Sequence, residues 1–137
     1  MSTVQAISPP SIQPPGGKYS HVLVVSGPHK SIEIAGQVGV KPDGTIPKTY
    51  EEQVKQAFSN LKACLDSVGP EKAIITRLRY YIVDYKYPEK FDALREAREI
   101  IFDGYTHPFP PSVLVPVPAL GDPDFLVEVE ASAVVPE

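Results

Sequence analysis

Side chains that can bind an anion or accept a proton recur in two segments that are predicted to be strands. Arg77 and Arg79 lie in the segment 74–84, IITRLRYYIVD, and Glu128 and Glu130 lie in the segment 126–135, LVEVEASAVV. Successive residues of a strand point to opposite faces, so each pair shares one face of its strand. A partly desolvated Glu128 carboxylate would order a water molecule or act as a general base. The alternative is an ion pair between Glu128 and Arg77 or Arg79 across strands, and the arginines are either anion ligands or members of such pairs.

Three further side chains are candidates for a binding cleft. Tyr19 follows Gly16-Gly17-Lys18 on an N-terminal arm that would either fold over a ligand or lead into the first strand. His107 lies in a proline-rich loop, where it would transfer protons or simply be solvated, since histidine is the usual proton-transfer side chain at neutral pH. Arg98 interrupts an apolar helical stripe, which indicates either a side chain that points into a cleft or one that reaches back to solvent.

Several other classes of site are not indicated. The three histidines are not at metal-ligand spacing. The single cysteine, Cys64, lies between Leu61 and Leu65 on an apolar helix face and is predicted to be a small buried hydrophobic residue. No phosphate-binding glycine motif occurs. With 17 acidic and 13 basic residues the net charge is −4, which argues against a nucleic-acid partner. No apolar run is long enough for a membrane span, so we expect no membrane partner.

The length and composition favour one domain. A chain of 137 residues can bury a hydrophobic core as a single unit. We divide it into a proline-rich N-terminal arm, 1–17, which is expected to be a flexible or extended lead-in, and a single domain, 18–137. One cysteine excludes an internal disulfide, and the first 17 residues lack the features of a signal or transit peptide. The expected location is the cytoplasm.

The predicted elements follow the order β-β-α-β-α-β-β. Thr49 and Glu52 form a capping box that starts the first helix, and Gly69-Pro70 ends it. Pro88 starts the second helix and Gly104 ends it. The expected strands are 21–26, 31–40, 74–84, 112–117 and 126–135. Turns are expected at 27–30 and 42–44.

This order predicts an α+β fold, in which a mixed sheet carries both helices on one face. Pro116, within the strand 112–117, and Pro118, just after it, remove hydrogen-bond donors along one edge, so this strand is expected at a sheet edge or to pair irregularly there. The other face of the sheet carries charges, among them Glu33 and Arg79. Such a face is either solvated or packed against identical subunits, and the sequence pattern leaves both alternatives open.

Four segments resemble the RidA/YjgF family. They are Ile34-Ala-Gly-Gln-Val-Gly39, the helix from Gln53 to Gly69, the stretch from Pro110 to Leu120, and Val127-Glu-Val-Glu-Ala-Ser-Ala133. The resemblance implies a chorismate-mutase-like α+β fold and a homotrimer with small-molecule sites in the clefts between subunits. It also implies hydrolysis of reactive enamines or imines to keto acids and ammonia, with no cofactor and no metal.

The resemblance also implies which residues form the site. Glu128 matches the catalytic carboxylate that positions water, and Tyr19 matches a tyrosine of the N-terminal arm. Arg95 falls close to a family asparagine. Together with His107, which was singled out by its loop position, the predicted ligand-binding set is Tyr19, Ala35, Gly36, Arg95, His107, Ser112 and Leu114.

The sequence departs from the family pattern where the substrate carboxylate should bind. Ser112 stands in place of the family arginine, Leu114 in place of a cysteine, and Ala35 in place of a serine. A serine cannot replace the two-pronged contact of a guanidinium with a carboxylate. The chain therefore resembles an arginine-lacking branch of the family. We expect it to hydrolyse 2-iminobutyrate no faster than buffer does, unless another cation takes over; the candidates are Arg77, Arg79, Arg95 and Arg98.

Two functions remain open from the sequence. The first is hydrolysis of an enamine, imine or related compound by an altered site. The second is a non-catalytic module that binds or senses a small metabolite. Ribonuclease activity or inhibition of translation, which belongs to the wider history of the family, fits an acidic chain least well.

Overall fold

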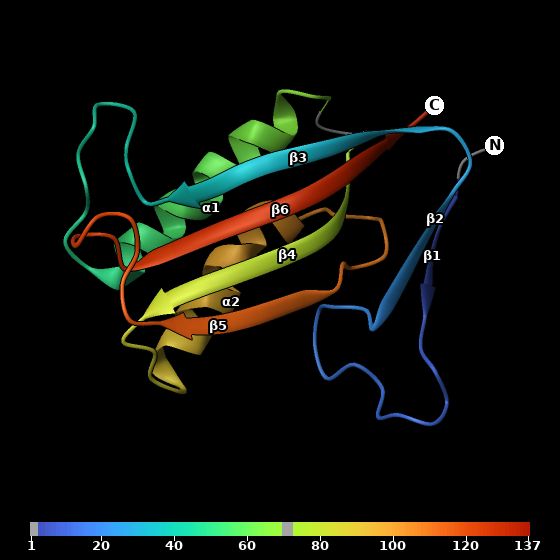
Figure 1. The fold of residues 1–137 in the computed structure, drawn as a ribbon, viewed down its shortest axis with the longest axis horizontal. Coiled ribbons are helices and arrows are strands. Elements are labelled where there is room, and N and C mark those ends of the chain that lie inside the picture. Colours follow the sequence, from blue (N-terminus) through green and yellow to red (C-terminus); the bar gives the residue numbers. More distant parts are fainter. Residues whose placement is uncertain (1–2, 70–72) are drawn as a thin grey trace.

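The computed structural model describes residues 3–69 and 73–137 (Figure 1). The described residues form two helices and six strands. In chain order these are β1 (Thr3–Ile7), β2 (Val22–Ser26), β3 (His29–Val38), α1 (Tyr50–Asp66), β4 (Ile74–Val83), α2 (Glu89–Phe102), β5 (Ser112–Val117) and β6 (Val127–Pro136).

Four strands form the main sheet, in the spatial order β3-β6-β4-β5. The pairs β3–β6 and β4–β6 are antiparallel, whereas β4–β5 is parallel, so the sheet is mixed. Both helices lie on one face of this sheet (Figure 1). The predicted α+β fold is confirmed, and β5, which carries Pro116, lies at the edge where its prolines placed it.

The N-terminal arm differs from the expected lead-in. β1 and β2 pair antiparallel in a separate two-stranded sheet beyond the end of the main sheet (Figure 1). The sequence did not predict β1. Residues 3–7 form their strand hydrogen bonds with β2, which lies about twenty residues later in the chain, so no local pattern marks them as a strand. The predicted turn at 27–30 was too long: Gly27, with φ of 83°, bends the chain, and β3 already begins at His29.

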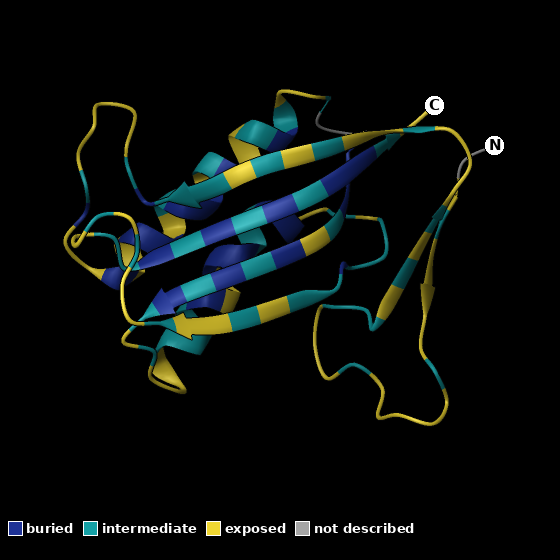
Figure 2. Ribbon diagram, viewed as in Figure 1, coloured by how far each residue is buried: buried dark blue, intermediate teal, exposed yellow. Residues whose placement is uncertain are grey.

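The core lies between the helices and one face of the main sheet. Residues along β4 and β6 alternate between buried and partly exposed (Figure 2). Leu78, Tyr80 and Ile82 of β4 are buried against the helices, as are Val127 and Val129 of β6. The alternation predicted for both strands is therefore confirmed.

Helix α1 begins as its capping box predicts. The Thr49 side chain accepts a hydrogen bond from the Glu52 backbone N–H at 3.2 Å. The predicted apolar stripe is buried up to Leu65, whereas Val68 lies beyond the helix and is exposed. Gly69 has φ of 105°, which favours glycine, and the predicted stop at Pro70 lies outside the described residues.

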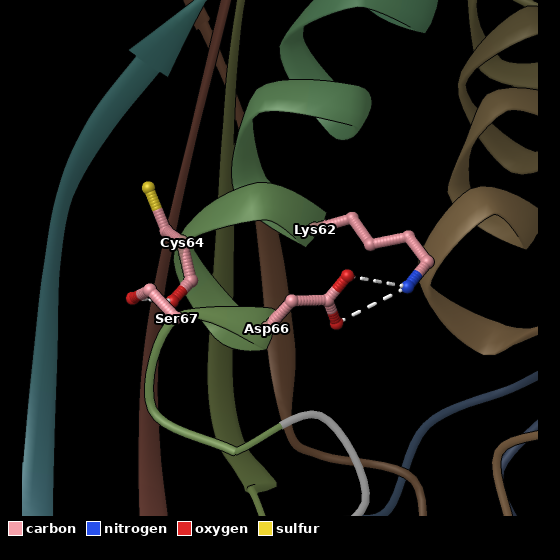
Figure 3. Close-up of polar contacts among 4 residues, drawn as sticks. All are labelled: Lys62, Cys64, Asp66 and Ser67. Atoms are coloured by element: carbon pink, nitrogen blue, oxygen red, sulfur yellow. Dashed lines mark hydrogen bonds and ion pairs between the residues drawn. The ribbon is translucent and has the colours of Figure 1, made fainter.

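The last turn of α1 is held by local polar contacts (Figure 3). Lys62 forms an ion pair with Asp66 at 2.8 Å, and the Ser67 hydroxyl donates to the Cys64 carbonyl at 2.6 Å. The Cys64 sulfur points away from these contacts. Cys64 is half-buried, because it lies at the border of the apolar face of α1. The prediction that this cysteine is buried is therefore only partly right.

Gln53, which is 1% exposed, connects three segments of the chain. Its side-chain NH₂ donates to the carbonyls of Pro47, at 2.8 Å, and Asp124, at 2.9 Å. Its side-chain oxygen accepts from the Leu126 backbone N–H at 2.9 Å. One buried amide thus satisfies three backbone groups in the loops that precede α1 and β6.

We predict that Gln53→Leu lowers the free energy of unfolding by on the order of 3 kcal/mol, because it leaves three backbone groups without partners. Urea denaturation measures the change. Lys55→Leu, an exposed substitution on the same helix, should change the stability by no more than about 0.5 kcal/mol. Equal losses in the two variants would contradict the role given to Gln53.

Candidate functional site

A cavity of about 220 Å³ lies between α2 and the edge strand β5. Its wall is formed by the N-terminal arm, by Tyr80 of β4, by α2 and by β5. The lining residues are Gly16, Gly17, Lys18, Tyr19, Tyr80, Phe91, Leu94, Arg95, Arg98, Ser112, Val113 and Leu114.

The pairing of β5 with β4 aims two predicted site residues at this cavity. In the parallel ladder, Ser112 lies beside Leu78 and Leu114 beside Tyr80. Since Leu78 and Tyr80 face the helices, their neighbours on β5 face the same side. Ser112 and Leu114 therefore both line the cavity. This agrees with their spacing, because residues two apart on a strand share one face.

Helix α2 supplies two of the cations that line the cavity, Arg95 and Arg98. Leu94, Ala97 and Ile101 are buried in the core, which fixes the rotation of the helix about its axis. The same rotation carries Arg98 inward, where it is 8% exposed and its guanidinium lies 5.4 Å from the centre of the Phe102 ring. Arg95, almost one turn earlier, lies at the exposed rim of the cavity.

The N-terminal arm crosses the mouth of the cavity. Lys18 forms an ion pair with Glu99 of α2, and the Ser20 backbone N–H donates to the Pro110 carbonyl at 3.4 Å. Between these two attachments Tyr19 is held half-buried, and its hydroxyl accepts from the Gly16 N–H at 3.4 Å. The arm segment around Tyr19 thus lies where it can cover a bound molecule.

Two buried polar atoms in the cavity wall have no hydrogen-bond partner among the described residues. They are the Tyr80 hydroxyl and Arg98 Nε. Burial raises the pKa of Tyr80, and the nearby Arg98 guanidinium and Ser112 side chain oppose this rise without reaching hydrogen-bond geometry. At neutral pH the Tyr80 hydroxyl is therefore a protonated donor. Unpartnered polar atoms at this depth are uncommon in folded proteins.

Glu128 lies on the opposite, polar face of the sheet. In the register of β6 its neighbours are Val38 and Tyr81. A Cβ atom added to Gly36 would lie 1.9 Å from Glu128 Oε2, so the carboxylate rests directly on the Gly36 backbone. Close approach of this kind requires glycine.

The alternative use of Glu128 as an ion-pair partner is not what the structure shows among its described residues. Arg79 instead lies 3.7 Å from Glu130, its register partner on β6. The Tyr81 hydroxyl donates to the same Glu130 carboxylate at 2.6 Å, and this hydrogen bond raises the pKa of Tyr81. Glu130 thus takes the ion-pair role, and Glu128 keeps a carboxylate without such a partner.

Ala35 and Gly36 form an irregularity in β3. The pairing with β6 shifts between Ile34 and Gln37, so these two residues oppose Glu130 alone, which is a β-bulge. Ala35 is exposed there. The bulge places the Gly36 backbone under the Glu128 side chain.

The predicted site residues therefore fall into two groups within one chain. Tyr19, Arg95, Ser112 and Leu114 meet at the cavity. Ala35, Gly36 and Glu128 meet on the β3–β6 side of the sheet. His107 belongs to neither group: it is half-buried in the loop before β5, with its ring 5.4 Å from that of Tyr105.

Sequence reasoning did not single out Tyr80 as a site residue. Its spacing from Leu78 and Ile82 predicts a place on the apolar face of its strand. The signal that could have identified it is its hydroxyl, because a buried tyrosine hydroxyl usually needs a hydrogen-bond partner. Arg98 was noticed for the same reason, as a charge in an apolar stripe, and the structure places it in the cavity wall.

The described residues contain no group of three or more His, Cys, Asp and Glu side chains arranged to hold a metal ion. Within the same residues, no helix is both long and apolar enough to span a membrane.

Comparison with known proteins places these features in a family. Residues 11–135 match the family described as Endoribonuclease L-PSP. A RutC family protein of Aquifex aeolicus is 34% identical over 100 residues, which cover 72% of this chain and 75% of that protein. A 2-iminobutanoate/2-iminopropanoate deaminase of Dermatophagoides farinae is 26% identical over 137 residues, covering 98% of this chain and 99% of that protein.

Two solved structures share the fold. The Rid family protein YyfB of Yersinia pestis, described as of unknown function, superimposes with a TM-score of 0.78 at 28% identity, covering 96% of this chain and 98% of that one. The YjgF gene product of E. coli superimposes with a TM-score of 0.63 at 28% identity, covering 76% of this chain and 80% of that one.

We predict that Gly36→Ala displaces the Glu128 carboxylate but leaves the fold stable, because the atoms in the way are the end of a flexible side chain. A matched control is Gly39→Ala, whose added Cβ would lie 2.5 Å from the Gln53 backbone oxygen. Backbone must move there, so this variant should lose roughly 1–3 kcal/mol of stability. Thermal unfolding and a crystal structure of each variant check both statements, and equal destabilisation by the two would refute them.

Proposed function

Because the chain belongs to the RidA/YjgF family, we propose that it is a homotrimer whose clefts between subunits bind a small imine or enamine and hydrolyse it. The observation that carries this proposal is the cavity between α2 and β5. Four of the residues expected to bind ligand line it, and it holds unpartnered hydrogen-bond donors. The deaminase relative, matched over almost its whole length, supports the reaction class.

The division of the site between two faces of the sheet supports assembly. No carboxylate is among the described residues that line the cavity, yet hydrolysis requires a base for water. Glu128 is such a base, but in its own chain it lies on the other face of the sheet. A neighbouring subunit that packs its β3–β6 side against the cavity would complete the site.

Exposed apolar side chains support the same assembly. Val113 and Val115 are 43% and 36% exposed, and they lie on the polar face of the sheet at its β5 edge. Apolar residues beside the charges of Arg79 and Glu130 are typical of a surface that another protein covers. In the proposed trimer this face is buried.

The chemistry follows from the two groups together. The C=N nitrogen reacts in its protonated form, so attack of the water oxygen on the carbon leaves it as an amine, and Glu128 accepts the proton that the water gives up. Glu128 returns this proton to the nitrogen, ammonia leaves as its bond to carbon breaks, and the hydroxyl gives its proton to Glu128 as the C=O bond forms. The products are a keto acid and ammonia, and the balance requires only water.

The second candidate is a non-catalytic module for binding a small metabolite. Phe91, Leu94 and Leu114 make one wall of the cavity apolar, which suits binding without turnover. The cytoplasmic location also stays a prediction.

The trimer is tested by light scattering coupled to gel filtration. The expected mass is three times that of the 14.9 kDa chain. The double variant Val113→Glu, Val115→Glu should shift the protein towards single chains, because it adds charge to the buried face. Val68→Glu, at an exposed position after α1, should not. A single-chain mass for the wild type would rule the trimer out.

Hydrolysis is tested with 2-iminobutanoate that threonine dehydratase generates in place and semicarbazide traps. The sequence alone predicts no hydrolysis of this imine unless another cation takes over from the family arginine, and the place of Arg98 in the cavity wall supports such a replacement. We therefore expect the wild type to lower semicarbazone formation and Glu128→Gln to abolish this effect without disassembly. If the wild type has no effect on this imine, the binding module is the better description.

Sharing of the site between subunits is tested by mixing two inactive variants. Leu114→Trp fills the cavity, and Glu128→Gln removes the base. Trimers refolded from an equal mixture should regain about a quarter of the wild-type activity, because that fraction of clefts pairs an open cavity with an intact Glu128. A site contained in one chain would regain none.

A further inference from the structure

We propose that the buried Arg98, together with the Tyr80 hydroxyl, forms the carboxylate-binding subsite of this cavity. The guanidinium that the family carries on β5 would then be supplied here by α2. This inference rests on the proposed function and adds to it the side chains of this chain that would hold the carboxylate of the ligand.

Of the three cations in the cavity wall, two already have carboxylate partners. Lys18 pairs with Glu99, and Arg95 donates to Asp92 at 2.9 Å. Their side chains are 45% and 55% exposed, so water screens them. Arg98 is 8% exposed and has no carboxylate partner among the described residues.

A buried charge without a partner is unfavourable, since burial removes its hydration. Arginine keeps its charge inside proteins, so the side chain cannot escape this cost by losing a proton. An anion that entered the cavity would supply the missing partner. The two-pronged geometry of a guanidinium suits a carboxylate in particular.

The Tyr80 hydroxyl strengthens this assignment. It is buried, it has no hydrogen-bond partner in the part of the chain that the structure describes, and burial raises its pKa so that it stays a donor at neutral pH. Arg98 and Ser112 both lie close enough to influence that pKa. Arg98 therefore reaches the neighbourhood of Ser112, and the short serine side chain leaves the space for it.

The remaining wall limits the rest of the ligand. Phe91, Leu94 and Leu114 offer an apolar surface beside the two donors, within about 220 Å³. A short apolar substituent next to a carboxylate fits both features. Large or strongly polar side chains do not.

A structural role for Arg98 makes a different prediction. If Arg98 serves mainly to pack its cation against the Phe102 ring, its removal should lower stability and leave ligand binding unchanged. If Arg98 is an unpaired subsite charge, Arg98→Met should keep or raise the melting temperature, because replacing buried charge by a similar apolar volume is often neutral or stabilising.

The experiment measures binding of 2-oxobutanoate, a stable acid of the product class, by titration calorimetry. We expect Arg98→Met to raise Kd at least tenfold, Arg98→Lys to raise it less, and Tyr80→Phe to raise it several-fold. Lys62→Gln removes one positive charge from α1, at a position that does not line the cavity, and should leave Kd unchanged. 2-Butanone, which lacks the carboxylate, should bind wild type and Arg98→Met alike.

The outcomes separate this inference from the proposed function. Binding that depends on Arg98 without imine hydrolysis supports the subsite and contradicts the hydrolase. Hydrolysis with kcat/KM unchanged in Arg98→Met supports the hydrolase and overturns the subsite. The subsite is also overturned if 2-oxobutanoate does not bind to the wild type, if it binds equally to Arg98→Met, or if Arg98→Met loses its fold.

Discussion

The rotation of α2 about its axis is the constraint on which the candidate site depends. Leu94, Ala97 and Ile101 must all enter the core, and only one rotation of the helix allows this. That rotation also brings Arg98 inward beneath the edge of the sheet. The helix therefore cannot bury its apolar stripe without also burying the charge of Arg98. The Arg98 side chain lines the cavity beside β5. Packing of the core and chemistry of the cavity have a common cause.

The sheet divides the remaining groups between its two faces. Strand alternation sends Tyr80 to the helices and Tyr81 to the polar face, and it separates Glu128 from the cavity in the same way. Within the described part of one chain, Arg95, Arg98 and the Tyr80 hydroxyl therefore line the cavity on one side of the sheet, and the Glu128 carboxylate lies on the other side. In the proposed trimer a neighbouring subunit would bring the two sides together, and the exposed Val113 and Val115 lie on the face that would be covered. Ser112, where the family resemblance implies an arginine, and Arg98 of α2 line the same cavity, and the proposed carboxylate subsite depends on this arrangement.

Much of the architecture could be predicted from short-range signals. The Thr49–Glu52 cap, the alternation in β4 and the edge position of β5 all depend on residues close together in the sequence, and all are confirmed. The family resemblance was equally visible, because it rests on four contiguous segments. Gln53 shows the limit of such signals: it was part of a predicted helix, but its three hydrogen bonds involve loops near Pro47 and Leu126 that only folding brings to it.

The sequence by itself determined which residue types are present and which of them share a face. It therefore identified Glu128, Ser112 and the odd charge at Arg98. Only the tertiary structure decided how deep each side chain lies and what lies beside it. The depth of Arg98 depends on how α2 sits on β4 and β5, and the isolation of Glu128 depends on Arg79 pairing with Glu130 instead. The strand β1 likewise exists because β2 lies beside it. Burial and partnership are properties of contacts between distant segments, and no local pattern contains them.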